Sequence, residues 1–179
     1  MARSLRTLSV RSGNLIEVLG IALAIGGLLL AASIRDPLSN LVLLAMVWVS
    51  LWYFPHCLIH FIVGRIAGIT FTHYLIGSSA LVKLELPYLR KVLRYLPVLG
   101  IRTDRASLRR SSPRARRLMF ESGAYGSMLL PSLAVIFSLS YSSATTSALL
   151  IIMSLVNVAV TLYYSPRAGD IWRARTSYY

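Results

Sequence analysis

The chain has 179 residues, 56% of them hydrophobic, and a formal net charge of +13, because only six acidic residues oppose 19 basic ones. So much apolar sequence in a short chain exceeds what one soluble core needs. The composition therefore excludes an ordinary soluble domain and indicates a membrane protein. The basic residues are arginines apart from Lys83 and Lys91, and arginine pairs with phosphate through two hydrogen bonds. The single cysteine, Cys57, excludes an internal disulfide framework.

The first apolar segment, residues 15–34, is long enough to cross a bilayer as a helix. Arg3, Arg6 and Arg11 precede it, and small residues occupy 31–33, which is also the pattern of a cleaved signal peptide. We favour a retained helix, because the run is somewhat long for the apolar region of such a peptide.

The second apolar segment, residues 41–63, carries His56 and His60 near its end. Residues four apart on a helix share one face and lie about 6 Å apart along the axis, so both imidazoles can reach one metal ion. Haem iron is a poorer match, because its two axial ligands lie on opposite sides of the metal. The alternative is a pair of histidines that only hydrogen-bond neighbouring helices. Ionisable residues within a span are nonetheless costly enough to be functional by default.

The central segment, residues 64–117, combines apolar patterns with most of the basic residues. Alternation from Ile69 to Ile76 predicts a strand, and leucines opposite basic residues in 86–99 predict a short helix lying in the membrane interface. The sequence RASLRRSSPRARR, residues 105–117, follows. We expect it to bind anionic lipid headgroups rather than nucleic acid, because no aromatic residue interleaves with its arginines.

Two further apolar segments, residues 118–139 and 148–164, precede a tail of residues 165–179. The N-terminal arm, the central segment and the tail are basic, whereas the other two connections contain only Arg35. If the helices alternate, the positive-inside rule places both termini and the central segment in the cytoplasm. The sequence thus predicts an all-α polytopic membrane protein of one domain, with four transmembrane helices, a short strand-like segment and an interfacial helix.

The stretch from His56 onward resembles the first active-site helix of the site-2 protease family, the intramembrane zinc metalloproteases. In that family, H-E-x-G-H is followed by a basic residue, a Gly-hydrophobic pair and a short strand that closes on an aromatic-hydrophobic-Gly sequence. The corresponding residues follow HCLIH here in the same order and spacing: Gly64-Arg65, Gly68-Ile69, Phe71, Tyr74 and Ile76-Gly77. The likeness spans roughly residues 41–175. It is specific at 56–77 and looser elsewhere, where residues 116–137 resemble the family's middle helix.

The resemblance implies a zinc ion held by His56, His60 and an aspartate near the cytoplasmic end of a later helix. Asp170 in YYSPRAGDIWRAR is the aspartate at that place. The family motif around this residue is missing, because Asn157 lies thirteen residues before Asp170 instead of within a compact Asn-Pro-x-Pro-x-x-Asp-Gly pattern. A tail carboxylate in solvent is therefore the alternative for Asp170. His73 is expected to be a polar residue of the strand-like segment rather than a ligand.

The glutamate that should follow the first histidine is replaced by Cys57. In H-E-x-x-H enzymes this glutamate moves the proton of the attacking water, and a thiol with a pKa of about 8.5 replaces it poorly at neutral pH. Cys57 is expected to be a small buried apolar residue, with a fourth metal ligand as the alternative. Glu17 and Glu121 lie in the same predicted half as the histidines and could in principle supply an acid, although Glu121 also suits the first turn of a helix. No catalytic residue is assigned.

Three functions follow from these patterns. The first is a catalytically impaired relative of the site-2 proteases, which binds Zn²⁺ and a transmembrane helix of another protein without cutting it. The second is an active intramembrane metallopeptidase, which uses zinc alone or an acid from elsewhere in the chain. The third is a metal-free scaffold subunit whose basic segment holds lipid headgroups, in which case His56 and His60 only pack.

Overall fold

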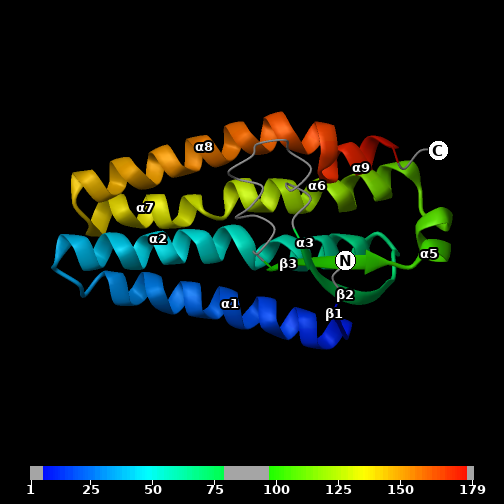
Figure 1. Ribbon diagram of the computed structural model, residues 1–179, viewed down its shortest axis with the longest axis horizontal. Helices are drawn as coiled ribbons and strands as arrows, with labels where there is room; N and C mark the ends of the chain where they lie inside the picture. Colours follow the sequence, from blue (N-terminus) through cyan, green and yellow to red (C-terminus); the bar gives the residue numbers. More distant parts are fainter. Residues whose placement is uncertain (1–5, 79–96, 177–179) are drawn as a thin grey trace.

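The computed structural model of the chain describes residues 6–78 and 97–176. Within these ranges the chain is mostly helical, and the long helices run side by side along one axis of the molecule (Figure 1). The predicted interfacial helix of residues 86–99 falls largely outside the described residues. The helices are α1 (Val10–Ala31), α2 (Pro37–Tyr53), α3 (Pro55–Ile66), α5 (Arg105–Arg110), α6 (Pro113–Leu129), α7 (Ser132–Tyr141), α8 (Ala144–Ala168) and α9 (Asp170–Thr176).

Four helical segments of the described chain are long and apolar enough to cross a membrane. They are α1 alone, α2 with α3, α6 with α7, and α8 with α9, covering Val10–Ala31, Pro37–Ile66, Pro113–Tyr141 and Ala144–Thr176. Their outer faces carry many exposed large apolar side chains, such as Leu23 at 77% exposure. Apolar surface this extensive is rare on soluble monomers, so the helices indicate a membrane protein.

Three of the four segments extend beyond both ends of the ranges predicted from hydropathy, whereas α1 begins earlier than predicted and ends at Ala31. The same three segments contain a break. Proline lacks a backbone N–H and cannot complete the helical ladder. Pro55 begins α3 immediately after α2, and Pro131 separates α6 from α7. Gly169 separates α8 from α9. Part of the predicted tail is thus helical, and the breaks at Pro55 and Gly169 directly precede His56 and Asp170.

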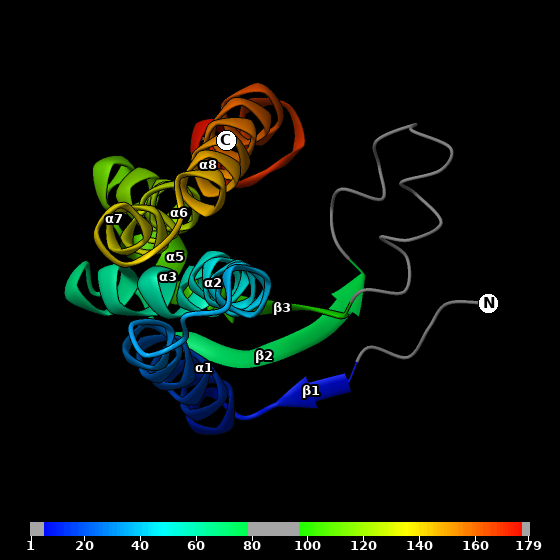
Figure 2. The ribbon, with the colours of Figure 1, turned by 90° about the vertical axis from the view of Figure 1, so that its left-hand side faces the viewer.

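A three-stranded antiparallel sheet accompanies the helices, in the order β1-β2-β3. It comprises β1 (Arg6–Leu8), β2 (Phe71–Ser78) and β3 (Pro97–Thr103). The prediction of one strand-like segment was right for β2 but missed both of its partners, so the chain is helical with a small sheet rather than all-α. Figure 2 shows the sheet curving beside α1 and α3.

Tyr74 at the centre of β2 pairs with Leu8 of β1 and Ile101 of β3. Its ring packs so closely on α1 that a Cβ at Gly13 would lie 2.2 Å from it. Glycine at position 13 therefore allows α1 to dock on the sheet. Toward the opposite end of the helices, Leu44, Trp48 and Leu150 belong to the apolar core that joins α1, α2, α7 and α8.

Candidate metal centre

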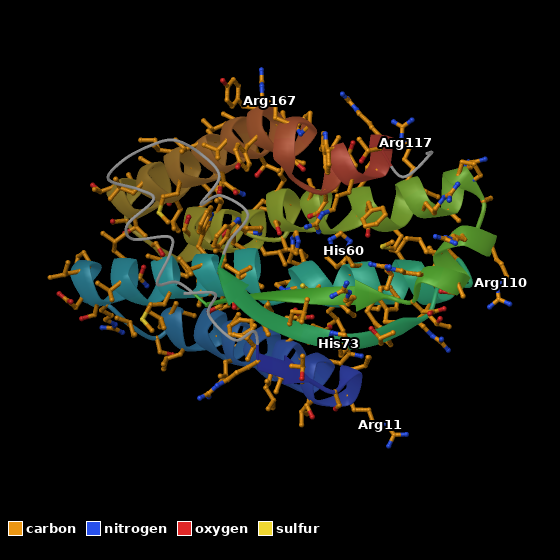
Figure 3. All side chains as sticks on the ribbon, turned by 45° about the vertical axis from the view of Figure 1, so that its right-hand side comes forward. Arg11, His60, His73, Arg110, Arg117 and Arg167 are labelled. Atoms are coloured by element: carbon orange, nitrogen blue, oxygen red, sulfur yellow. The ribbon has the colours of Figure 1, made fainter. Side chains whose placement is uncertain are left out.

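Helix α3 places the two histidines one turn apart on the face that packs against α6. The ring centroids of His56 and His60 are 4.8 Å apart and the rings are nearly perpendicular. His60 is buried, whereas the side chain of His56 is 31% exposed. Figure 3 shows His60 pointing into the space between α3 and α6. One histidine is thus held within the protein and the other borders an accessible space.

Asp170 reaches the histidines because the chain turns sharply between α8 and α9. A Cβ at Gly169 would lie 2.8 Å from Cα of Ser165, so the turn requires glycine there. The Ser165 hydroxyl accepts the backbone N–H of Ile171 and thereby caps the new helix. Helix α9 packs against α6, which brings Asp170 Oδ2 to 3.1 Å from His56 Nε2 and 3.4 Å from His60 Nε2.

The hydrogen bonds behind the rings fix which nitrogen of each histidine faces Asp170. Ser127 donates its only hydroxyl proton to the carbonyl of Trp52, so its Oγ accepts Nδ1–H of His56 at 2.9 Å. The carbonyl of Met119 can only accept, and it takes Nδ1–H of His60 at 2.6 Å. In neutral histidines both Nε2 atoms therefore carry a lone pair toward Asp170.

The resulting cluster is suited to a cation. The ligand atoms of His56, His60 and Asp170 lie within 4.8 Å of one another. Two imidazole lone pairs and a carboxylate repel each other unless a metal ion or added protons lie among them. Two nitrogens and one oxygen are a donor set that Zn²⁺ accepts, and three protein ligands leave one position open for another molecule. The residues therefore fit a zinc ion.

Close packing between α3 and α6 holds the cluster in place. A Cβ at Gly123 would lie 2.2 Å from Nε2 of His60, so α6 approaches the imidazole as only glycine allows. Farther along α6, Pro131 cannot donate to the carbonyl of Ser127, and Asn157 of α8 donates to that carbonyl at 2.8 Å instead. The helix that orients His56 is thereby tied to the helix that leads to Asp170.

The other candidate residues lie outside the cluster. Cys57 is buried and its thiol donates to the carbonyl of Leu99 in β3, so it is a packing residue and not a fourth ligand. His73 lies in β2, a strand and not a loop, and its ring contacts Thr72. Figure 3 separates His73 from His60. Glu121 does not begin a helix, because α6 starts at Pro113, and it pairs with Arg117 at 2.8 Å.

Glu17 of α1 is fully buried beside the cluster. Its Oε2 lies 3.1 Å from the hydroxyl of Tyr74, and its Oε1 has no hydrogen-bond partner among the described residues. The carboxyl lies against the thiol and backbone of Cys57 and interacts electrostatically with His56. Burial raises the pKa of Tyr74, which keeps its hydroxyl protonated as a hydrogen-bond donor. The sequence predicts Glu17 in the same half of the helical bundle as the histidines, but it does not show that Glu17 contacts Cys57.

The structure thus brings together the three residues that the sequence predicted as ligands, and adds Ser127 and Met119 as their hydrogen-bond partners. The fold and the cluster define a class: a mostly helical protein with four helical segments long and apolar enough to span a membrane, and a candidate metal centre between its helices. No protein-family model matches the chain, and no curated protein or solved structure is significantly similar to it. The likeness to site-2 proteases therefore rests on residues 56–77 and on the position of Asp170.

Proposed function

We propose that this protein is a membrane metalloprotein of the site-2 protease type, with Zn²⁺ held by His56, His60 and Asp170. The observation that carries the proposal is the convergence of the three ligand atoms within 4.8 Å. Outer hydrogen bonds that fix the tautomer of a ligating histidine are a regular feature of zinc sites, and Ser127 and Met119 supply them here.

The chemistry depends on whether an acid assists the metal. When bound, Zn²⁺ polarises a carbonyl group and makes water more acidic. Helix α3 itself supplies no acid, because Cys57 follows His56, and this supports a catalytically impaired protein that binds a transmembrane helix of a partner. The burial of Glu17 beside Cys57 favours the second candidate, an active intramembrane metallopeptidase.

The experiment that tests zinc binding is elemental mass spectrometry of detergent-purified protein that has never been exposed to a chelator. We expect about one zinc per chain, and loss of that zinc in His56→Ala/His60→Ala, since three ligands form the usual minimum set. His73→Ala is the matched control, because this histidine lies outside the cluster. Absence of zinc from the native protein, or retention of zinc in the double variant, would favour the metal-free scaffold function instead.

The same proposal includes an orientation and a lipid contact. We infer that both termini and the segment between α3 and α6 lie in the cytoplasm, because arginine is concentrated in those parts of the chain. The arginines of residues 105–117 are suited to anionic headgroups at that surface, and nucleic acid is not an expected partner.

A further inference from the structure

We propose that Glu17 of α1 supplies the proton-accepting carboxylate that α3 lacks, so that the metal centre is completed by an acid from a different helix. The inference rests on the proposed zinc site and specifies how that site works. In a motif of the H-E-x-x-H type, the carboxylate projects from the residue after the first histidine. Here that position is Cys57, and the carboxyl of Glu17 lies against its thiol and backbone.

The burial of Glu17 is the first physical argument for this role. An acid with no exposed surface loses its hydration, and such a residue is retained where its partners or its function compensate for that loss. The Tyr74 hydroxyl, which also lies 2.7 Å from Oδ1 of Asn14, is a hydrogen-bond partner of Oε2 only. Oε1 has no partner among the described residues, so one oxygen of a fully buried carboxyl is free to accept a proton.

The second argument is the size of the side chain at position 57. A cysteine is small enough to leave room beside His56 for a carboxyl from a neighbouring helix, and its thiol donates away from the cluster to Leu99. The carboxyl of Glu17 interacts favourably with His56, the residue that precedes Cys57.

The third argument is that α1 is held firmly enough to position the carboxyl. Gly13 lets the helix approach the ring of Tyr74, and Gly20 lets it approach the ring of Phe54. A Cβ at either glycine would lie 2.2 Å from a ring atom. Glu17 lies between these two contacts, about one helical turn from each. Positioning within a fraction of an ångström is what proton transfer requires.

The proton transfers in the proposed reaction balance without a redox step. Water attacks the carbonyl carbon of a peptide bond, a C–O bond forms, and Glu17 Oε1 accepts the proton that the water releases. The C–N bond then breaks and Glu17 returns the proton to the leaving nitrogen, which yields a carboxylic acid and an amine. The substrate class is therefore a peptide bond of a membrane-embedded segment that can reach His56, the more exposed histidine.

The test uses a probe whose binding requires a proton acceptor, and not turnover of an unidentified substrate. Acetohydroxamic acid chelates a metal and gives up one proton to a nearby base. We would titrate it into the detergent-purified, Co²⁺-loaded protein and follow the visible absorption of the cobalt. Glu17→Gln keeps the shape and the Tyr74 contact but cannot take the proton, so we expect affinity to fall about 10- to 100-fold with metal content unchanged.

Rescue from the other helix distinguishes this role from a structural one. Adding Cys57→Glu to Glu17→Gln restores a carboxylate from α3, and we expect affinity to return to within about three-fold of native. Glu121→Gln is the matched control, a buried acid that pairs with Arg117 instead, and it should leave probe binding unchanged. If Glu17→Gln does not fold, Glu17→Asp replaces it in the test. This variant retracts the carboxylate by one methylene, so it must also weaken binding of the probe.

The outcomes separate the two proposals. Native affinity in a folded, metal-loaded Glu17→Gln or Glu17→Asp variant would overturn the role of Glu17 and leave the zinc site intact. Loss of metal from Glu17→Gln would make this residue a support of the ligands and would also overturn the proton-accepting role. If the native protein binds neither zinc nor cobalt, both proposals fail together.

Discussion

Ser127 determines which nitrogen of His56 is free for a metal, although it lies on another helix. Its hydroxyl proton goes to the carbonyl of Trp52, so its oxygen must accept from the imidazole. A ring without this partner rotates more freely and divides between two tautomers, which weakens metal binding. The contribution of Ser127 is thus to orient the ligand without touching the metal.

We predict that Ser127→Ala lowers zinc affinity by about 10- to 100-fold while zinc is still bound at saturation. Competition with a fluorescent zinc chelator measures the change. Ser138→Ala is the control, because Ser138 is equally buried but donates to the carbonyl of Val135 in its own helix. Equal affinities of the two variants would contradict the orienting role.

At this scale the sequence identified the three residues that cluster, but not their surroundings. The spacing of His56 and His60 is a property of one helix, so it could be read directly. Asp170 came from resemblance to a family and not from geometry. Ser127 could not be recognised, and Glu17 could not be chosen over Glu121, because one sequence does not show which face of α6 or α1 meets α3, and the chain is rich in serine.

The element scale is governed by close approaches that depend on glycine. Helix α6 passes directly over the ring of His60 at Gly123, and the break before α9 depends on Gly169. Both glycines lie in contacts that the donor atoms require, although neither offers a ligand. The cluster therefore depends on how closely the helices pack as much as on its three side chains.

We predict that Gly123→Ala abolishes detectable zinc binding, because the added methyl group would lie 2.2 Å from Nε2 of His60 and must displace the ring. Zinc content by elemental mass spectrometry is the measurement. Gly126→Ala provides a control on the same helix, since its methyl group would meet the flexible end of Ile59 at the same distance.

We expect Gly126→Ala to lower thermal stability in detergent, by about 1–3 kcal/mol if Ile59 repacks incompletely, yet to retain zinc. Retention of zinc in Gly123→Ala would mean that His60 is not a ligand in the orientation described. Loss of zinc in both variants would instead indicate general sensitivity of the packing between α3 and α6.

Hydropathy located the four membrane segments but not their breaks or the sheet. A window about 19 residues wide averages over Pro55 and Pro131, and prolines are tolerated in membrane helices when other groups take the freed carbonyl. Asn157 does this for Ser127. Strand β1 is only Arg6–Leu8 and pairs with residues more than sixty positions away, so nothing local in the sequence marks it.

The whole molecule has a strongly unequal distribution of charge along its long axis. Strand β1, helix α5 and helix α9 lie toward the same end of the bundle, whereas the α1–α2 and α7–α8 connections lie at the other (Figure 1). Among the described arginines, Arg35 alone belongs to a connection at that second end. Such asymmetry is what the positive-inside rule describes, so we expect the arginine-rich end and the nearby metal centre to face the cytoplasm.

Labelling of single cysteines in cells tests this orientation. In a Cys57→Ala background, Ala106→Cys places an exposed thiol in α5 and Thr145→Cys places one at the start of α8. An impermeant maleimide should label Thr145→Cys in intact cells, and Ala106→Cys only after permeabilisation. The reverse pattern would contradict the orientation but leave the four crossings intact. Labelling of both in intact cells would contradict the crossings themselves, because α6 with α7 separates the two positions by one passage through the bilayer.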